Sequence, residues 1–171
     1  MSLSPSDLYP KNLFTNFVQF SVCAAPVPQP RPKARRIGSN GIQIYTPQGI
    51  HVKAYKKLIA DAYTEALGSL QVDLTSDIDL EVTFIIERPQ NMCGPSYPTE
   101  MIPHNKKPDI DNLLKTVMDA LNEVAWSDDS NVVNLSCRKL HAPIIFGGKS
   151  GRKRLSSGPR VIVTIKYLDI K

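Results

Sequence analysis

Several stretches of the chain show the residue patterns of β-strands. Residues 78–86 (IDLEVTFII) alternate apolar and acidic positions before becoming fully apolar, which predicts a strand whose first half has one face in water. Residues 13–24 are rich in β-branched and aromatic residues and predict a first strand. Residues 132–140 and 160–168 predict two more, and IQIYTP at 42–47 adds a short strand.

Two other stretches show the three-and-four spacing of amphipathic helices. Residues 51–67 predict a first helix, and Gly68 is a suitable stop signal. Residues 111–124 predict a second helix with one continuous apolar stripe. The opposite side of this second helix carries Asp111, Lys115, Asp119 and Asn122.

The segments between these elements predict how the domain is organised. Residues 1–12 predict a flexible N-terminal tail, and residues 13–171 a single folded domain. Alternating prolines in PVPQPRPKARR (26–36) favour an extended, exposed arm and exclude a helix or a central strand. Residues 88–107 predict a long loop, and residues 147–159 a flexible basic hairpin tip. The resulting fold class is α/β (α+β), a mixed sheet of about four strands packed with two main helices.

Composition narrows the class of protein. The chain has 171 residues, and no apolar run approaches the roughly 20 residues of a membrane-spanning helix. The N-terminus lacks the pattern of a secretory signal, so we expect a soluble cytoplasmic protein. Cys23, Cys93 and Cys137 are widely separated and lack metal-ligand spacing, which favours buried free thiols over disulfides or a zinc site.

Charge is distributed unevenly along the chain. Residues 1–60 hold eight Lys/Arg and one acid, residues 61–129 hold four and fourteen, and residues 130–171 hold nine and one. The segment charges are therefore +7, −10 and +8, which agree with the net charge of +5. This pattern predicts that the basic flanks bind a polyanion, and that the acidic central segment would repel the polyanion unless cations lie between them. An acid-rich face in contact with water would explain the central segment as well.

Candidate metal chemistry is concentrated in one segment, at Asp109, Asp111, Lys115, Asp119, Asp128 and Asp129. Pro108 disfavours helix at the preceding residue, so Asp109 stands at the helix entrance, and Asp111 and Lys115 lie one turn apart. A turn after the helix would return Asp128 or Asp129 to the same place. Carboxylate oxygens are the ligands that Mg²⁺ prefers, and such ions promote phosphodiester hydrolysis. Lys115 would either stabilise negative charge in the transition state or orient the attacking water.

Each of these residues also has an ordinary structural explanation. Asp109 and Asp111 are typical helix-capping and dipole-compensating residues, and Asp111 with Lys115 could form an exposed ion pair. Asp128 and Asp129 are typical turn formers. Trp126 could contact DNA, but a single Trp beside a helix end is more often part of the core.

The joint order of these residues resembles a known family. The segment KPDIDNLLKTVMDALNEVAWSDDSNVVNL, residues 107–135, is similar to the signature of the RusA family of Holliday junction resolvases, in which a D-x-D-N-L-x-K helix precedes an aromatic residue and a D-D pair. The resemblance implies that Asp109, Asp111 and Asp129 bind Mg²⁺ (Mn²⁺ can replace it) and that Lys115 is essential for cleavage. Asp128, Asp119 and Asn112 match further motif positions and are given supporting roles.

The same resemblance extends to fold, partners and reaction. PVPQPRPKARR and YTP are similar to a basic arm and turn of the family, although this match is less specific than the central motif. The resemblance implies a small α/β homodimer that makes paired, symmetrical cuts in four-way DNA junctions during recombination and repair. The N-terminal tail, the proline-rich loop before the motif and the basic insertion near the C-terminus depart from shorter family members and leave substrate preference open.

Basic residues outside the motif predict a DNA-backbone surface. Neither basic segment has regularly interleaved aromatic residues, so phosphate contacts are expected rather than base stacking. The candidates are Arg31, Lys33, Arg35, Arg36, Lys106, Lys107, Lys149, Arg152, Lys153 and Arg154. Two alternatives to a junction resolvase stay open: a nuclease for forks or flaps, and a non-catalytic DNA-binding module whose acids are structural.

Overall fold

The computed structural model describes residues 14–38, 41–45, 49–147 and 153–168. The strands are β1 (Phe14–Val22), β2 (Lys33–Ile37), β3 (Gly41–Tyr45), β4 (Asp77–Ile86), β5 (Ile102–Pro103), β6 (Val132–His141), β7 (Ile144–Gly147), β8 (Lys153–Ser156) and β9 (Arg160–Leu168). The α-helices are α1 (Ile50–Leu67) and α2 (Ile110–Leu121), and two short 3-10 helices are η2 (Gln90–Met92) and η3 (Asp129–Asn131). Together they form one mixed α+β domain, as the sequence predicts.

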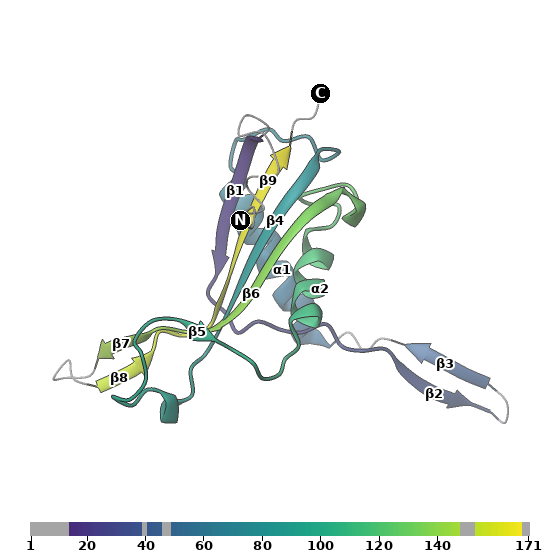
Figure 1. Cartoon of the computed structure of the whole chain (residues 1–171). Helices are drawn as coiled ribbons and strands as arrows, with labels where there is room; N and C mark the ends of the chain where they lie inside the picture. The colour runs from purple at the N-terminus through teal and green to yellow at the C-terminus, as the bar shows by residue number, and fades with distance from the viewer. Residues whose placement is uncertain (1–13, 39–40, 46–48, 148–152, 169–171) are drawn as a thin grey trace, which may run out of the picture.

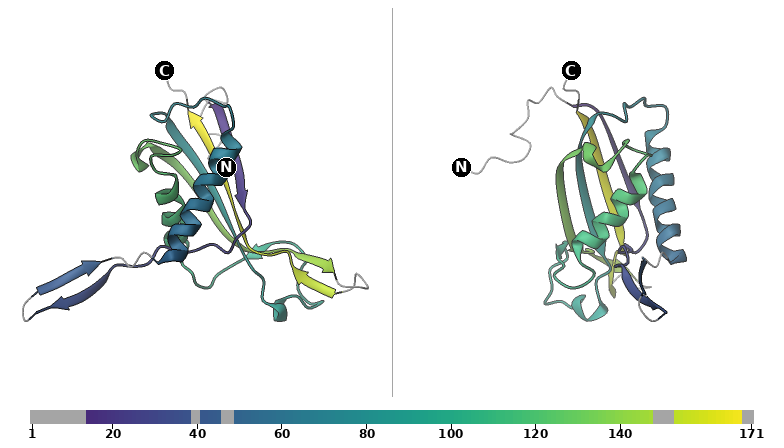
Figure 2. Two further views of the ribbon diagram at one scale, coloured as in Figure 1. Left: turned by 180° about the vertical axis from the view of Figure 1, so that it is seen from behind. Right: turned by 90° about the vertical axis from the view of Figure 1, so that its right-hand side faces the viewer.

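A five-stranded mixed sheet is the centre of the domain (Figure 1). Its strand order is β1-β9-β4-β6-β5, with β4 and β6 parallel and the other neighbours antiparallel. Parallel neighbours need a long crossover connection, and here the crossover contains α2. Both helices cover the same face of the sheet (Figure 2).

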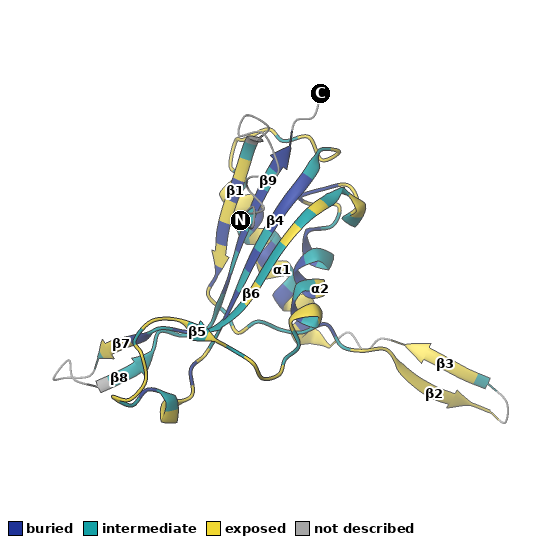
Figure 3. Cartoon of the chain, viewed as in Figure 1, coloured by how far each residue is buried: buried dark blue, intermediate teal, exposed yellow. Residues whose placement is uncertain are grey.

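The core forms between that face and the two helices. Alternate residues of β1, β4 and β9, such as Val18, Leu80 and Val163, are buried in a core cluster that also contains residues of both helices. Figure 3 shows the buried stretches of these strands in dark blue. On α2 the buried stripe includes Leu113, Val117 and Leu121, which recur every four residues. This stripe orients α2 and leaves its charged side in water.

A tyrosine pair joins α1 to the end of β9. The hydroxyls of Tyr63 on α1 and Tyr167 on β9 lie 2.7 Å apart, and Tyr167 also donates to the carbonyl of Ala125 at 2.9 Å. Burial and the neighbouring phenol raise the pKa of Tyr167, so it stays neutral and can donate. The Tyr167 hydroxyl thereby ties the segment after α2 to the sheet.

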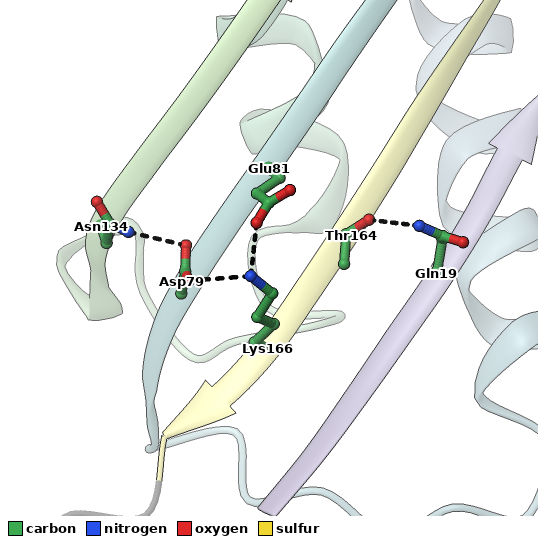
Figure 4. A network of polar contacts seen from close by, with 6 residues as sticks. All are labelled: Gln19, Asp79, Glu81, Asn134, Thr164 and Lys166. Atoms are coloured by element: carbon green, nitrogen blue, oxygen red, sulfur yellow. Dashed lines mark hydrogen bonds and ion pairs between the residues drawn. The ribbon is translucent and has the colours of Figure 1, made fainter. Parts of the chain in front are cut away.

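The second face of the sheet carries polar side chains (Figure 4). Lys166 on β9 lies between two acids of β4, at 2.5 Å from Glu81 and 3.4 Å from Asp79. Asn134 on β6 donates to the almost fully buried Asp79 at 3.0 Å. These contacts bridge three neighbouring strands and satisfy Asp79.

Several sequence-based boundaries need correction. The arm after Pro32 is not only extended, because residues 33–37 form β2, which pairs with β3 in a separate two-stranded hairpin. Prolines are excluded from the central strands of a sheet, but both strands of a two-stranded hairpin are edge strands. The sheet gains a short fifth strand, β5, and α2 ends at Leu121 instead of Val124, with Glu123 at φ 61° in the following turn.

Cys23 is exposed instead of buried, and all three cysteines are free. The predicted tail, residues 1–12, lies outside the described residues.

Two hairpins extend from the same end of the sheet. The β2–β3 hairpin and the β7–β8 hairpin project in opposite directions there (Figures 1 and 2). Every residue of β2 is exposed, and Ile42 and Ile44 on β3 are each 74% exposed. In the part of the chain that the structure describes, neither helix is long and apolar enough to cross a bilayer.

A histidine pair packs where β5 meets β6. The rings of His104 and His141 are 4.4 Å apart between centroids, and the Nδ1 atom of each is buried without a hydrogen-bond partner. Burial lowers the pKa of both imidazoles, and nearby positive charges lower it further: His141 and Lys139 act on His104, and Arg88 and Lys106 act on His141. Both rings are therefore held neutral at neutral pH.

This pair predicts an acid-sensitive stability. Because the folded-state pKa values lie below the ordinary value of about 6.5, the unfolded chain binds protons more readily, and the free energy of unfolding should fall as pH drops below about 6.5. His104→Gln should flatten this loss, and His51→Gln, which changes an exposed histidine on α1, should leave it intact. Urea denaturation between pH 7.5 and 5 measures the effect; parallel pH profiles for all three proteins would contradict it.

Candidate active site at the N-terminus of helix α2

Asp109 stands at the entrance of α2 but does not cap it. The residue has extended backbone angles (φ −70°, ψ 144°), and its side chain makes no capping hydrogen bond. A cis peptide bond between Lys107 and Pro108 precedes it. Since the carboxylate is not needed by the helix, the capping explanation does not account for Asp109. Its Oδ2 atom instead accepts a hydrogen bond from Arg31 at 2.9 Å.

Asp109 and Asp111 line one open hollow of about 600 Å³. Four cations line it too: Lys106, Lys107, Arg138 and Lys139. The remaining lining residues are His104, Asn105, Ile110 and Cys137. Burial raises the pKa of the Cys137 thiol to about 11, so this sulfur stays protonated and is a poor metal ligand. The hollow thus combines two acidic oxygen donors with a basic rim.

Lys139 holds the loop that leads into Asp109. From β6, its Nζ atom donates to the carbonyl oxygens of Lys106 at 2.6 Å and Pro108 at 2.5 Å. The backbone of the same residue accepts from His104 N at 3.0 Å. These bonds join the loop to the rigid sheet. Sequence reasoning missed Lys139 and Arg138, because only strand pairing brings β6 beside a loop some thirty residues earlier.

A second hollow, of about 500 Å³, lies on the other side of Asp109. Its lining residues are Pro28, Gln29, Arg31, Lys107, Pro108, Asp109 and Asn112. The backbone N–H of Gln29 donates to the carbonyl of Asn112 at 2.8 Å, which fastens the proline-rich arm to the first turn of α2. Asn112 therefore makes this hydrogen bond through its backbone carbonyl oxygen and not through its side chain.

Lys115 lies one turn beyond Asp111 on the exposed side of α2. The structural explanation for Asp111 and Lys115 was an exposed ion pair. Among the described residues, the structure shows no ion pair between these two side chains. Asp119, one further turn along, is 2.8 Å from Lys56 of α1. Asp119 therefore joins the two helices, as a structural residue would.

The two aspartates after α2 have different surroundings. Asp128 accepts from the backbone N–H of Ser130 and forms a capping box with Asn131; the hydrogen bonds from Ser130 lower the pKa of Asp128. Asp129 accepts from the indole N–H of Trp126 at 3.0 Å. Trp126 is fully buried, which makes it a core residue that also orients Asp129.

The structure does not bring Asp129 to Asp109 and Asp111 within one chain. A turn was expected to return it to the helix entrance, but α2 separates the two places by twelve residues, or about 18 Å. Ser127 N instead binds the carbonyl of Leu74 at 2.8 Å, beside the start of β4. Accordingly, no three Asp, Glu, His or Cys side chains among the described residues are grouped so that they could hold one metal ion.

The carboxylates of Asp109 and Asp111 nevertheless suit the coordination preferences of Mg²⁺. Mg²⁺ typically takes only one or two protein carboxylates and fills its other positions with water and phosphate oxygens. Asp109 and Asp111 supply two such groups on an open surface. Softer metals prefer sites built from several thiolate or imidazole ligands, and no three Cys, His, Asp or Glu side chains of the described residues are grouped to form one.

Arg31, Lys106 and Lys107 line the two hollows, and the other basic candidates fall into three groups. Lys33, Arg35 and Arg36 lie exposed on β2. Arg154 on β8 donates to the carbonyls of Cys93 and Tyr97, both at 2.9 Å, and its guanidinium covers the Phe146 ring. Lys149 and Arg152 lie outside the described residues, as does the side chain of Lys153.

Comparison with known proteins agrees with the motif at this site. Residues 24–166 match the family model described as endodeoxyribonuclease RusA. The chain is also 27% identical over 131 residues to the uncharacterized protein YqaN of Bacillus subtilis (strain 168), an alignment that covers 73% of this chain and 88% of that protein. Because the family match spans both hollows, both helices and most of the sheet, the chain belongs to the RusA family of endodeoxyribonucleases.

Proposed function

We propose that the protein is a Mg²⁺-dependent endonuclease that resolves four-way DNA junctions by paired, symmetrical hydrolysis of phosphodiester bonds. The observation that carries the proposal is the hollow at the start of α2, which Asp109 and Asp111 line together with four basic residues. Acids alone would repel DNA, and cations alone would bind it without cutting. Their combination suits a site that takes up a metal ion and a phosphate together.

The residues of the hollow and the neighbouring Lys115 have different roles in the proposed reaction. Asp109 and Asp111 hold the metal ion, which Mn²⁺ can replace. When bound, such an ion supplies Lewis-acid activation of the phosphate and of the attacking water. Lys106, Lys107 and Arg138 attract the phosphates on either side of the cut. Lys115, exposed one turn from Asp111, either compensates the charge that develops at the phosphate or orients the water.

Asp129 joins this site through a homodimer. Within one chain it lies beyond the opposite end of α2, so a direct role requires a second copy whose Asp129 approaches the first copy's Asp109 and Asp111. A two-fold axis would create two equivalent sites, which matches the approximate two-fold symmetry of a four-way junction. Paired cuts then follow from the symmetry of the assembly.

The arms bind the DNA outside the cut. Lys33, Arg35 and Arg36 are exposed on a hairpin that follows Arg31, a lining residue of the second hollow, and extends away from the domain (Figure 1). A two-stranded ribbon of this kind fits along a duplex, and its cations contact the backbone without reading sequence. We assign the same backbone-binding role to Lys149, Arg152 and Lys153. We place this reaction in the cytoplasm.

The first prediction tests the acids. Asp111→Asn should lower the cleavage rate of a labelled four-way junction by at least about 100-fold while junction binding persists, because the change removes negative charge without removing bulk. Asp119→Asn is the matched control: it removes the same charge from the same helix and should retain cleavage, at a cost of about 1–3 kcal/mol in the free energy of unfolding, because the bond to Lys56 is partly buried. Equal cleavage by wild type and Asp111→Asn would reject the assignment.

A second prediction tests the shared site. Asp111→Asn and Asp129→Asn should each be inactive, but a mixture with exchanged subunits should regain cleavage, because each mixed dimer contains one site with all aspartates intact. About a quarter of the wild-type sites would be restored, and they should give single nicks instead of paired cuts. An inactive mixture in which mass spectrometry detects mixed dimers would show that Asp129 does not act across subunits.

A third prediction concerns the arms. If about six cations contact phosphates, the logarithm of junction affinity should fall with the logarithm of salt concentration at a slope near −5. Arg35→Gln combined with Arg36→Gln should reduce the magnitude of that slope by about 2. Fluorescence anisotropy at several salt concentrations measures both slopes, and identical slopes would remove the hairpin from the DNA interface.

A further inference from the structure

One cation of the arm is placed differently from the rest. Arg31 contacts Asp109 directly, with its Nη2 atom 2.9 Å from Oδ2, whereas Lys33, Arg35 and Arg36 lie on the hairpin beyond. Its side chain is 74% exposed and that of Asp109 is 43% exposed. A positive charge thus occupies the carboxylate that the proposed function assigns to the metal ion.

The backbone holds Arg31 at this position. Gln29, two residues earlier, is 9% exposed, and its N–H donates to the carbonyl of Asn112 in α2 at 2.8 Å. Pro30 and Pro32 flank Arg31, so the chain on both sides is restricted to extended conformations. The guanidinium can therefore change partners while its backbone stays beside Asp109.

The ion pair itself is weak enough to exchange. Exposed pairs of this kind shift an equilibrium by only about two- to fivefold. A dication that binds the same carboxylate would compete with the guanidinium, because two positive charges that share one carboxylate repel each other. We propose that Arg31 couples metal binding to DNA binding: it neutralises Asp109 in the metal-free protein and passes to a DNA phosphate when a divalent cation takes that carboxylate.

The released side chain has a place to act. It lines the second hollow together with Lys107 and Asn112, directly beside Asp109. A guanidinium presents paired donors that match two phosphate oxygens, so it binds a DNA strand better when it is free than when it serves Asp109. Metal binding should then tighten DNA binding, and by reciprocity DNA should tighten metal binding by the same factor.

The first experiment measures metal binding without DNA. The melting temperature is recorded against Mg²⁺ concentration for wild type, Arg31→Gln and Lys33→Gln, since an ion that binds the folded state raises this temperature. Arg31→Gln should need about two- to fivefold less Mg²⁺ for the half-maximal rise, because the competing cation is gone. Lys33→Gln removes the same charge from the same arm and should change the requirement by less than about twofold, since Lys33 is exposed on β2 and, among the described residues, Arg31 is the one ion-paired with Asp109.

The second experiment measures the coupling with junction DNA. Fluorescence anisotropy gives the dissociation constant in EDTA and in Ca²⁺, a hard cation that also binds carboxylates. In wild type, Ca²⁺ should tighten binding by about two- to fivefold. Arg31→Gln should lower this ratio to the part that neutralisation of the two aspartates supplies, whereas Lys33→Gln should weaken binding in both conditions and keep the wild-type ratio.

The outcomes separate this inference from the function on which it rests. If wild type shows the Mg²⁺ response but Arg31→Gln retains both the wild-type Mg²⁺ requirement and the wild-type Ca²⁺ ratio, the coupling role is wrong and the metal site stands. Equal effects of Arg31→Gln and Lys33→Gln would likewise overturn it, because general charge would explain them. If Mg²⁺ leaves the melting temperature of wild type unchanged, the metal site and the coupling role fall together.

Discussion

The packing of α2 on one face of the sheet, as the connection between two parallel strands, determines where every candidate residue can act. The helix is the crossover from β4 to β6, and its apolar stripe of Leu113, Val117 and Leu121 is fully buried. A helix held in this way runs antiparallel to β6, so its N-terminus lies beside the end of β6 and its C-terminus beside the beginning. The acids at its entrance and the acids after its exit are therefore kept apart within the chain.

The entrance of α2 is positioned from three directions. Lys139 of β6 binds the carbonyls of the preceding loop, Gln29 of the arm binds Asn112 in the first turn, and the buried stripe holds the helix itself. Two of these supports are hydrogen bonds to backbone carbonyls, which position the chain without using any acidic side chain. Asp109 and Asp111 consequently line an open surface that is held in place by rigid elements, and the side-chain contact of Asp109 is an exposed ion pair with Arg31.

The charge pattern along the chain becomes a spatial pattern through this arrangement. The acidic central segment places two carboxylates in one hollow, and the basic flanks place Arg31 beside them and Arg138 and Lys139 on the rim. Other acids of the same segment are used within the fold: Asp119 binds Lys56, Asp79 and Glu81 bind Lys166, and Asp128 caps η3. The excess of acids in the sequence therefore overstates the number at the candidate site.

The sequence by itself determined the parts that depend on local spacing. The four long strands, both helices and the adjacency of Asp109 and Asp111 follow from periods of two and three-to-four residues, and the core position of Trp126 was also anticipated. Only the tertiary structure decided which distant segments meet. The pairing of β4 with β6 brought Lys139 to the loop before α2, the anchored arm brought Arg31 to Asp109, and the length of α2 placed Asp129 elsewhere. These outcomes depend on strand order and helix direction, which arise from burial across the whole domain and leave no periodic pattern in the local sequence.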